Sequence, residues 1–329
     1  MKKLINDVET VLAESLDGFA AAHADIVTLG AERQFVRRRE VKPGKVALIS
    51  GGGSGHEPLH AGFVGHGMLD VACPGQVFTS PTPNQMLAAA QAVDGGAGVL
   101  FIVKNYSGDM MNFQMAAEML DRENATVIVN DDVAVENSTY TTGRRGVAGT
   151  LIVEKIVGAA AERGDKLAVL KSLGDAVNSA TASMGVALSS CTVPAAGKPT
   201  FQIGADEMEM GVGIHGEPGR RRVKLGSADE IAAELTGAIL KDLSLKPGRE
   251  VLLLVNGFGG TPLLELYLMV NAAQKVLAGA GIKAVRFLTG SYVTSLEMAG
   301  CSITVSAVDT AALALWDAPV HTAALRWGR

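Results

Sequence analysis

The sequence contains few cysteines. Only three cysteines occur among the 329 residues, Cys73, Cys191 and Cys301. They are far apart in the sequence, which argues against a disulfide framework and against a metal site built from cysteine pairs. This use of cysteine is typical of a protein from a reducing compartment.

Basic residues and long apolar runs are also in short supply. Lys and Arg number 29 against 34 for Asp and Glu, which gives a formal net charge of -5. Nucleic acid is therefore an unfavourable main partner, because phosphate neutralisation needs a basic surface. No apolar run reaches the roughly 18 residues that a membrane helix needs, and Asp7, Glu9 and Glu14 interrupt what would be the core of a signal peptide. We expect a cytoplasmic protein with no membrane or nucleic-acid partner.

Apolar material is plentiful, and in the first half of the chain it lies in short strands that alternate with helical stretches. Hydrophobic residues make up 48% of the sequence. The predicted strands are Lys45–Ser50, Gly98–Val103 and Thr126–Val129. The predicted helices are Leu4–Phe19, a helix opened by Pro81-Thr82-Pro83, one ending near Met119, Val147–Glu162 and Lys166–Ala182. This alternation predicts a largely parallel sheet with helices on both faces.

A second set of elements begins near residue 184. The segments predicted to be extended are Gly185–Ser190, Met208–Ile214, Val251–Val255, Lys283–Leu288 and Ile303–Val308. The predicted helices are Ala228–Lys241 with Ser227 as its N-cap, Pro262–Leu277, and a short helix capped by Asp309. We therefore predict an α/β protein of two α/β domains, residues 1–184 and 185–329, with mainly parallel or mixed sheets flanked by helices.

The segment GGGSGHEPLHAG, which follows the Lys45–Ser50 strand, is the most unusual stretch of the chain. A Walker loop would need Gly-Lys-Ser/Thr after its glycines, and this one continues Gly55-His56-Glu57. The dinucleotide fingerprint needs glycine at its first, third and sixth places, and neither Gly51 nor Gly53 starts such a series. Both phosphate-binding interpretations are therefore weak.

His56-Glu57-Pro58-Leu59-His60 matches the letters of a zinc protease motif. That motif requires both histidines on one face of a continuous helix, and Pro58 between them disfavours such a helix. We expect no metal here. The alternatives that stay open are a tight turn with a buried histidine, and a site where a small polar ligand meets bare backbone between the glycines and a following helix start.

Other predicted strand ends carry polar residues. Ligands of open α/β sheets lie outside the carboxyl ends of the strands, where Lys104, Asp109 and Ser80 are expected. His215 lies among glycines, which have no side chain that could bury it. This indicates that His215 is presented to a ligand. A free imidazole titrates near pH ~6.5 and can act as a nucleophile. Arg220-Arg221-Arg222 is either a solvated face or a docking surface for a phosphorylated or nucleotide-bearing partner.

Nine motifs, in the same order along the chain, give the sequence a resemblance to a known family. They are GGGSGHEP, CPGQVFTSPTP, KNYSGDMMNF, DDVAV, GRRGVAGT, CTVPAAGKP, EMEMGVGIHGEPG, GTPLLELY and LALWDAPVHTAALRWG. They resemble the dihydroxyacetone kinase family, specifically its K subunit, over nearly the whole chain. The resemblance implies a phosphotransferase subunit of two α/β domains, which pairs as a homodimer.

The resemblance also assigns roles to individual residues. It implies that the ketone of dihydroxyacetone adds to His215 and forms a hemiaminal, and that His56 accepts the proton of the attacking hydroxyl with Asp109 close to that proton. It further implies substrate-binding roles, which fall on Gly53, Ser54, Gly55, Ser80 and Lys104. Covalent capture follows only from the resemblance, whereas the glycines, Asp109 and His215 stand out by themselves.

The resemblance implies that the nucleotide is bound elsewhere. We expect no cofactor on this chain, with ADP or ATP and magnesium on a separate nucleotide-binding L-type subunit. The donor is either free ATP or phosphoenolpyruvate acting through a phosphocarrier M-type subunit. The segment between Arg222 and Val251 is shorter than in some family members. Two other functions stay open: a kinase subunit for another short ketose such as erythrulose, and a non-catalytic ketone-sensing coregulator.

Overall fold

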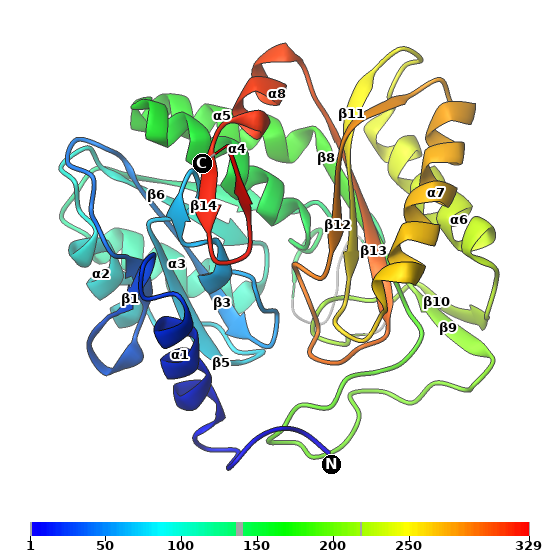
Figure 1. Ribbon diagram of the computed structural model, residues 1–329, viewed down its shortest axis with the longest axis horizontal. Helices are drawn as coiled ribbons and strands as arrows, with labels where there is room; N and C mark the ends of the chain where they lie inside the picture. The colour runs from blue at the N-terminus through cyan, green and yellow to red at the C-terminus, as the bar shows by residue number, and fades with distance from the viewer. Residues whose placement is uncertain (1, 136–140, 218, 329) are drawn as a thin grey trace.

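A computed structural model describes residues 2–135, 141–217 and 219–328; Pro218, in the motif EMEMGVGIHGEPG, lies outside them. Two six-stranded sheets lie side by side with helices packed on them, and a small three-stranded sheet joins the end of the chain to the first half (Figure 1). The predicted fold class is confirmed. No helix in the described ranges is both long and apolar enough to cross a membrane.

The first sheet has the order β1-β2-β5-β3-β6-β7. Its strands are β1 (Val27–Leu29), β2 (Val36–Arg38), β3 (Ala47–Ser54), β5 (Val71–Val77), β6 (Val99–Lys104) and β7 (Asn124–Val129). The last four are parallel to one another, whereas β1 and β2 pair antiparallel. Every residue of β3 and β6 is buried, as the continuous apolar runs predict for central parallel strands.

The helices of the first half cover both faces of this sheet. They are α1 (Val11–Ala22), α2 (Pro83–Ala92), α3 (Ser107–Met119), α4 (Gly149–Arg163) and α5 (Leu167–Ser179), with short 3-10 turns at Ala31–Arg33 and Ala61–Phe63. Successive strand residues point to opposite faces. Accordingly Ile49 packs in the core with α2 and α3, whereas Leu48 packs in the core that contains α4 and α5.

The second sheet has the order β10-β9-β8-β13-β11-β12 and is mixed. Its strands are β8 (Thr181–Ala187), β9 (Glu207–Met210), β10 (Arg221–Lys224), β11 (Glu250–Gly257), β12 (Lys283–Gly290) and β13 (Gly300–Ala307), and only β11 and β12 pair parallel. Two helices, α6 (Ala228–Leu243) and α7 (Leu263–Gly279), share a core with one face of this sheet.

The helix α4 lies between the two sheets and is the most buried helix of the described chain. Each of its residues from Gly149 to Ala161 is buried. It packs against β3, β6 and β7 of the first sheet and against β8 and β13 of the second. One apolar core therefore runs from Leu48 of β3 through Ile152 of α4 to Leu252 of β11.

The chain ends against its own first half. After β13 come α8 (Thr310–Asp317), β14 (Val320–Thr322) and β15 (Arg326–Trp327), and β14 pairs with β4 (Gly65–His66). The predicted domain boundary, between residues 184 and 185, lies inside the strand β8, which belongs to the second sheet.

Several element ends differ from the predictions for local reasons. The first helix begins at Val11 rather than Leu4, and the Asp7 side chain instead accepts the Glu9 backbone N–H at 2.8 Å, a local turn that competes with helix. The strand β3 continues through Ser54 instead of ending at Ser50. The predicted caps are confirmed, because Ser227 accepts the Glu230 N–H and Asp309 accepts the Ala312 N–H.

An ion-pair cluster ties the end of α4 to the first sheet and makes stability depend on pH. Glu162 pairs with Arg38 of β2. Burial raises the pKa of Glu162, but the charges of Arg38 and Lys45 and the hydrogen bond from Arg38 outweigh it and bring the pKa to about 2. The stabilisation is fully present above the ordinary pKa of about 4.3 and is lost as pH falls toward about 2.

We expect Glu162→Gln to lower the free energy of unfolding at pH 7 by about 1.5–3 kcal/mol, because an ionic hydrogen bond is lost. Denaturant unfolding of wild type and variant at several pH values measures the difference. It should shrink as the pH falls below about 4.3. The exposed pair of Arg221 and Glu234 supplies a control, since Glu234→Gln should change stability by less than about 1 kcal/mol. A difference that stays constant with pH would contradict this.

Candidate functional site

Glycines in β3 let other groups approach its backbone closely. A Cβ on Gly53 would lie 2.6 Å from the Thr79 backbone nitrogen, and one on Gly52 would lie 2.4 Å from Lys104 Nζ. The expectation of a loop leading into a helix start is wrong, because Gly51 to Gly53 are strand residues and the chain then turns into a 3-10 turn at Ala61–Phe63. The glycines therefore provide room beside a strand rather than a helix N-terminus.

A cavity of about 640 Å³ lies at the carboxyl end of this strand. It contains four of the predicted site residues, Gly53, Ser80, Asp109 and His215. Its other lining residues are Phe78, Thr79, Tyr106, Ser107, Gly108, Asn112, Val193 and Thr200. The first half of the chain thus supplies one wall, and the segments after β8 and β9 supply the other.

His215 lies at the boundary between the cavity and the protein interior. Its ring makes edge contacts with the rings of Tyr106, His56 and Phe78, with centroids 4.5, 4.7 and 5.4 Å away. Its side chain retains 15% exposure. The glycines beside it in the sequence do not cover it, as predicted, but three aromatic rings from the other half of the chain do.

Glu217 lies against His215 through one backbone hydrogen bond and one longer ionic contact, and no hydrogen bond to His215 Nδ1 is present among the described residues. The His215 backbone N–H donates to Glu217 Oε2 at 2.8 Å, and His215 Nδ1 lies 3.7 Å from Glu217 Oε1. Burial raises the pKa of Glu217, but the hydrogen bond from His215 and the charges of His215 and Arg145 bring it down to about 2. An ionised carboxylate therefore faces Nδ1, which leaves Nε2 as the ring nitrogen away from Glu217.

A buried arginine completes this arrangement and was not predicted as a site residue. Arg145 lies with Nη1 3.7 Å from Glu217 Oε1, donates from Nε to Asp132 Oδ2 at 2.8 Å, and donates from Nη2 to the Gly211 carbonyl at 2.7 Å. The adjacent charges Asp131-Asp132 and Arg144-Arg145 in a mostly apolar chain were the available signal. The sequence alone does not tell which of them lie inside.

His56 has one ring nitrogen occupied and one without a partner. Its Nδ1 lies 2.7 Å from the Thr294 carbonyl oxygen, which can only accept, so Nδ1 carries the proton. Its Nε2 is buried and has no hydrogen-bond partner among the described residues. Burial, followed by the charges of His215 and Lys104, holds the pKa of His56 well below its usual range. His56 is therefore a neutral imidazole with a free acceptor nitrogen.

The Lys104 ammonium lies beside Asp109 and does not itself line the cavity. Lys104 Nζ is 3.6 Å from Asp109 Oδ2 and donates to the Gly51 carbonyl at 3.2 Å. Asp109 is buried in the first turn of α3, and its Oδ1 has no hydrogen-bond partner within the part of the chain that the structure describes. Within the described ranges, Asp109, whose Oδ1 has no partner, lines the cavity together with His215, and His56, whose Nε2 has no partner, lies in ring contact with His215.

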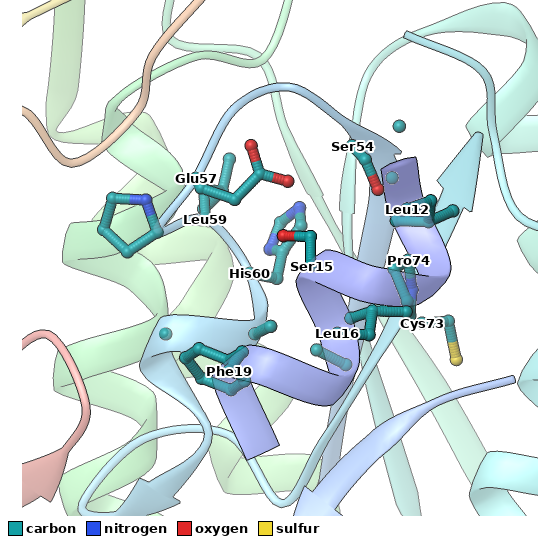
Figure 2. Close-up of a pocket in the computed structure, with 16 residues that line it drawn as sticks. Leu12, Ser15, Leu16, Phe19, Ser54, Glu57, Leu59, His60, Cys73 and Pro74 are labelled. Carbon is teal, nitrogen blue, oxygen red and sulfur yellow. The ribbon is translucent and has the colours of Figure 1, made fainter. Parts of the chain in front are cut away.

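Four predicted site residues do not line this cavity: His56 and Lys104, which lie behind it in the contacts just described, and Ser54 and Gly55. The Ser54 hydroxyl donates to the Gly75 carbonyl at 2.7 Å and lines a second cavity of about 310 Å³ next to α1 (Figure 2). Gly55 has a left-handed φ of 99°, and its N–H donates to the Glu57 carboxylate. Neither residue lines the cavity that contains His215.

Two further features from the sequence are the possible metal ligands and the arginine run. Over residues 2–135, 141–217 and 219–328, no group of three His, Cys, Asp or Glu side chains could hold a metal ion. In the arginine run, Arg221 and Arg222 lie in β10 and pair with Glu234 and Glu209 at 2.7 and 3.1 Å.

A family model described as the Dak1 domain matches residues 17–324. The chain belongs to the Dak1 family. It is 50% identical, with all of both chains covered, to a PEP-dependent dihydroxyacetone kinase, dihydroxyacetone-binding subunit DhaK, from Escherichia coli (strain K12). The predicted resemblance is confirmed.

Two solved Dak1-like structures have the same fold. The dihydroxyacetone kinase operon co-activator Dha-DhaQ superimposes with a TM-score of 0.90 at 32% identity, covering 94% of this chain and 97% of that chain. The native form of the dihydroxyacetone kinase of C. freundii superimposes with a TM-score of 0.86 at 33% identity, covering 98% of this chain and 60% of that chain.

We expect His56 to remain neutral, with its proton on Nδ1, from about pH 5.5 to 8, although an ordinary histidine titrates within that range. Two-dimensional ¹⁵N–¹H spectra of histidine side chains measure the tautomer, and His56→Gln assigns the signals. Free histidine in the same buffer is the control that should titrate near pH ~6.5. A proton on His56 Nε2 at neutral pH would contradict the assignment.

Proposed function

We propose that the chain is the dihydroxyacetone-binding subunit of a dihydroxyacetone kinase, and that it presents a hydroxyl of the ketose for phosphorylation. The observation that carries the proposal is the pair of histidines in edge contact. His215 lines the cavity and is backed by a carboxylate, whereas His56 is neutral with a free ring nitrogen. The names of Dak1 relatives such as the Escherichia coli subunit support the same substrate.

In the proposed capture step, His215 Nε2 attacks the ketone carbon. The carbon–nitrogen bond forms as the π electrons of the carbonyl move to its oxygen, which takes up a proton. The imidazole loses its Nδ1 proton, so the product is a neutral hemiaminal. Glu217 stabilises the cationic ring that forms on the way, because its ionised carboxylate lies 3.7 Å from Nδ1. A carboxylate in this position acts by orienting the imidazole and stabilising its charge.

In the proposed transfer step, a substrate hydroxyl attacks the phosphorus of the donor and gives its proton to His56 Nε2. The fixed tautomer and the free Nε2 support this role. Asp109 lines the cavity, and its Oδ1 is a second possible acceptor of the proton. The positively charged Lys104 lies 3.6 Å from Asp109 Oδ2. A positioned base of this kind typically contributes about 10²–10⁴-fold to the rate.

The proposal places the phosphoryl donor on another chain. A nucleotide-binding L-type subunit would supply ADP or ATP with magnesium, with an M-type phosphocarrier when phosphoenolpyruvate is the source. The name of the Escherichia coli relative includes PEP dependence and supports the latter. We further propose that the protein is a cytoplasmic homodimer and binds no cofactor of its own.

A ketone-sensing coregulator is the second candidate, favoured by the TM-score of 0.90 with the co-activator Dha-DhaQ. Binding of the ketose is common to both functions, so the acceptors for the hydroxyl proton distinguish them. His56 and Asp109 are both present with a free atom each. Phosphorylation of dihydroxyacetone by the chain with an L-type subunit supports the kinase, and its failure with every donor supports the coregulator.

The size of the cavity leaves room for a larger ketose. A volume of about 640 Å³ accommodates erythrulose as well as dihydroxyacetone. Comparing kcat/KM for the two ketoses decides between them.

We expect His215→Ala to abolish covalent capture because no other group attacks the carbonyl. Carbon NMR with dihydroxyacetone labelled at its carbonyl carbon measures this. The bound carbon should change from a ketone shift to a tetrahedral shift in the wild type alone, and ketose affinity should fall at least about tenfold in the variant. A tetrahedral signal in His215→Ala, or a ketone signal in the bound wild type, would exclude the covalent role.

We expect Asp109→Asn to capture the ketose but to transfer phosphate poorly. The amide retains the shape of the carboxylate and loses its charge and its capacity to accept a proton. The tetrahedral NMR signal should persist while kcat with an L-type subunit falls about 10²-fold or more. Glu118→Gln, an exposed change on the same helix, is the control. Unchanged kcat in Asp109→Asn would show that Asp109 is dispensable for transfer.

A further inference from the structure

We propose that Glu154 and His60 are positioning residues that fix the direction of the Lys104 ammonium beside Asp109. This inference rests on the proposed function. Neither residue lines the cavity that contains His215, and neither does Lys104. Both therefore act through the contact of Lys104 with Asp109, which does line the cavity. Together they form a chain of contacts from the buried helix α4, across β3, to the substrate site.

This series of contacts consists of four side chains, each of which lies close to the next. Glu154 Oε1 lies 2.7 Å from His60 Nδ1, and His60 Nε2 lies 2.9 Å from Lys104 Nζ. Lys104 Nζ then lies 3.6 Å from Asp109 Oδ2. All four side chains are buried. Burial raises the pKa of Glu154 to about 8, so the charged pair among the four is that of Lys104 with Asp109. Buried charged groups are costly unless they are paired.

The chemistry of the two ends sets the direction of each hydrogen bond. An ammonium only donates, so His60 Nε2 accepts and its proton is on Nδ1. That Nδ1–H then donates to Glu154 Oε1, with the Ser50 hydroxyl 3.0 Å away and itself donating to the Ile102 carbonyl. Burial, and then the charge of Lys104, lowers the pKa of His60 well below its usual range, which agrees with a neutral acceptor.

These contacts determine where the remaining proton of Lys104 points. One N–H donates to His60 Nε2 and a second to the Gly51 carbonyl. The third is left for Asp109, which lines the cavity. Gly52 provides the space, because a Cβ there would lie 2.4 Å from Lys104 Nζ and 3.5 Å from His60 Nε2. Loss of His60 or of the Glu154 acceptor would free the ammonium to turn away from the site.

A double-mutant cycle on ketose affinity tests the inference. Calorimetric titration of dihydroxyacetone into wild type, His60→Leu, Lys104→Met and the double variant gives four values of Kd. We expect His60→Leu and Lys104→Met each to weaken binding by about tenfold or more, since each removes a hydrogen bond to a charged group. The double variant should bind no more weakly than Lys104→Met alone. Multiplying effects would overturn the inference.

Two changes at Glu154, one conservative and one not, together with a control on α4, separate a positioning role from a structural role. Glu154→Gln keeps an oxygen that accepts from His60 Nδ1–H and should keep the wild-type Kd, whereas Glu154→Leu should weaken binding as His60→Leu does. Lys155→Met is the matched control on α4: its buried ammonium donates to the Leu315 carbonyl instead, so its loss should leave the Kd unchanged. Equal weakening in Glu154→Gln, Glu154→Leu and Lys155→Met would show a structural effect only.

A further test uses the wild type alone, so it does not depend on whether a variant folds. Side-chain ¹⁵N spectra should show His60 with its proton on Nδ1 and none on Nε2, with or without ketose, and an Nε2 proton would overturn the inference. If the wild type does not bind dihydroxyacetone, the proposed function fails while this tautomer is still tested. If it binds and the cycle is additive, only the role of Glu154 and His60 fails.

Discussion

The burial of α4 between two sheets is the constraint on which the rest of the structure depends. From Gly149 to Ala161 the helix is buried, so the charged residues in that span have no access to water and each must find a partner in the protein. Glu154 pairs with His60, Lys155 donates to the Leu315 carbonyl, and Glu162 near the end of the helix pairs with Arg38. These contacts join α4 to the turn after β3, to α8 and to β2, and they fix how the two halves meet.

The substrate site is built at that junction by two charged chains that end at one cavity. Asp132, Arg145 and Glu217 lead to His215. Behind the other wall, His60 leads to Lys104 and Asp109. Because each set of contacts is buried, the groups at its end have a fixed direction. Such preorganisation suits both capture of a small ketose and removal of a proton from its hydroxyl.

Local patterns predicted much of the fold and part of the site. The apolar run of β6 indicated a central parallel strand, and Ser227 and Asp309 were recognisable helix caps because capping is a contact within a few residues. Gly53, Asp109 and His215 stood out as polar or bare positions at strand ends. The glycines of β3 suggest a loop from the sequence, whereas in the structure they leave room for Lys104 and the Thr79 backbone. The sequence does not show this role because those neighbours are distant along the chain. His60 was set aside with the failed zinc motif for the same reason.

The sequence by itself determined the α/β class, the family and the residues able to do chemistry, since these depend on residue type, periodicity and short motifs. The tertiary structure alone decided that His56 has a free Nε2, that Glu217 faces His215, and that a glutamate inside α4 reaches a lysine of β6 through His60. The physical reason is that protonation state and hydrogen-bond direction depend on burial and on partners tens to hundreds of residues away. Thr294, the partner of His56, is 238 residues from it in the chain.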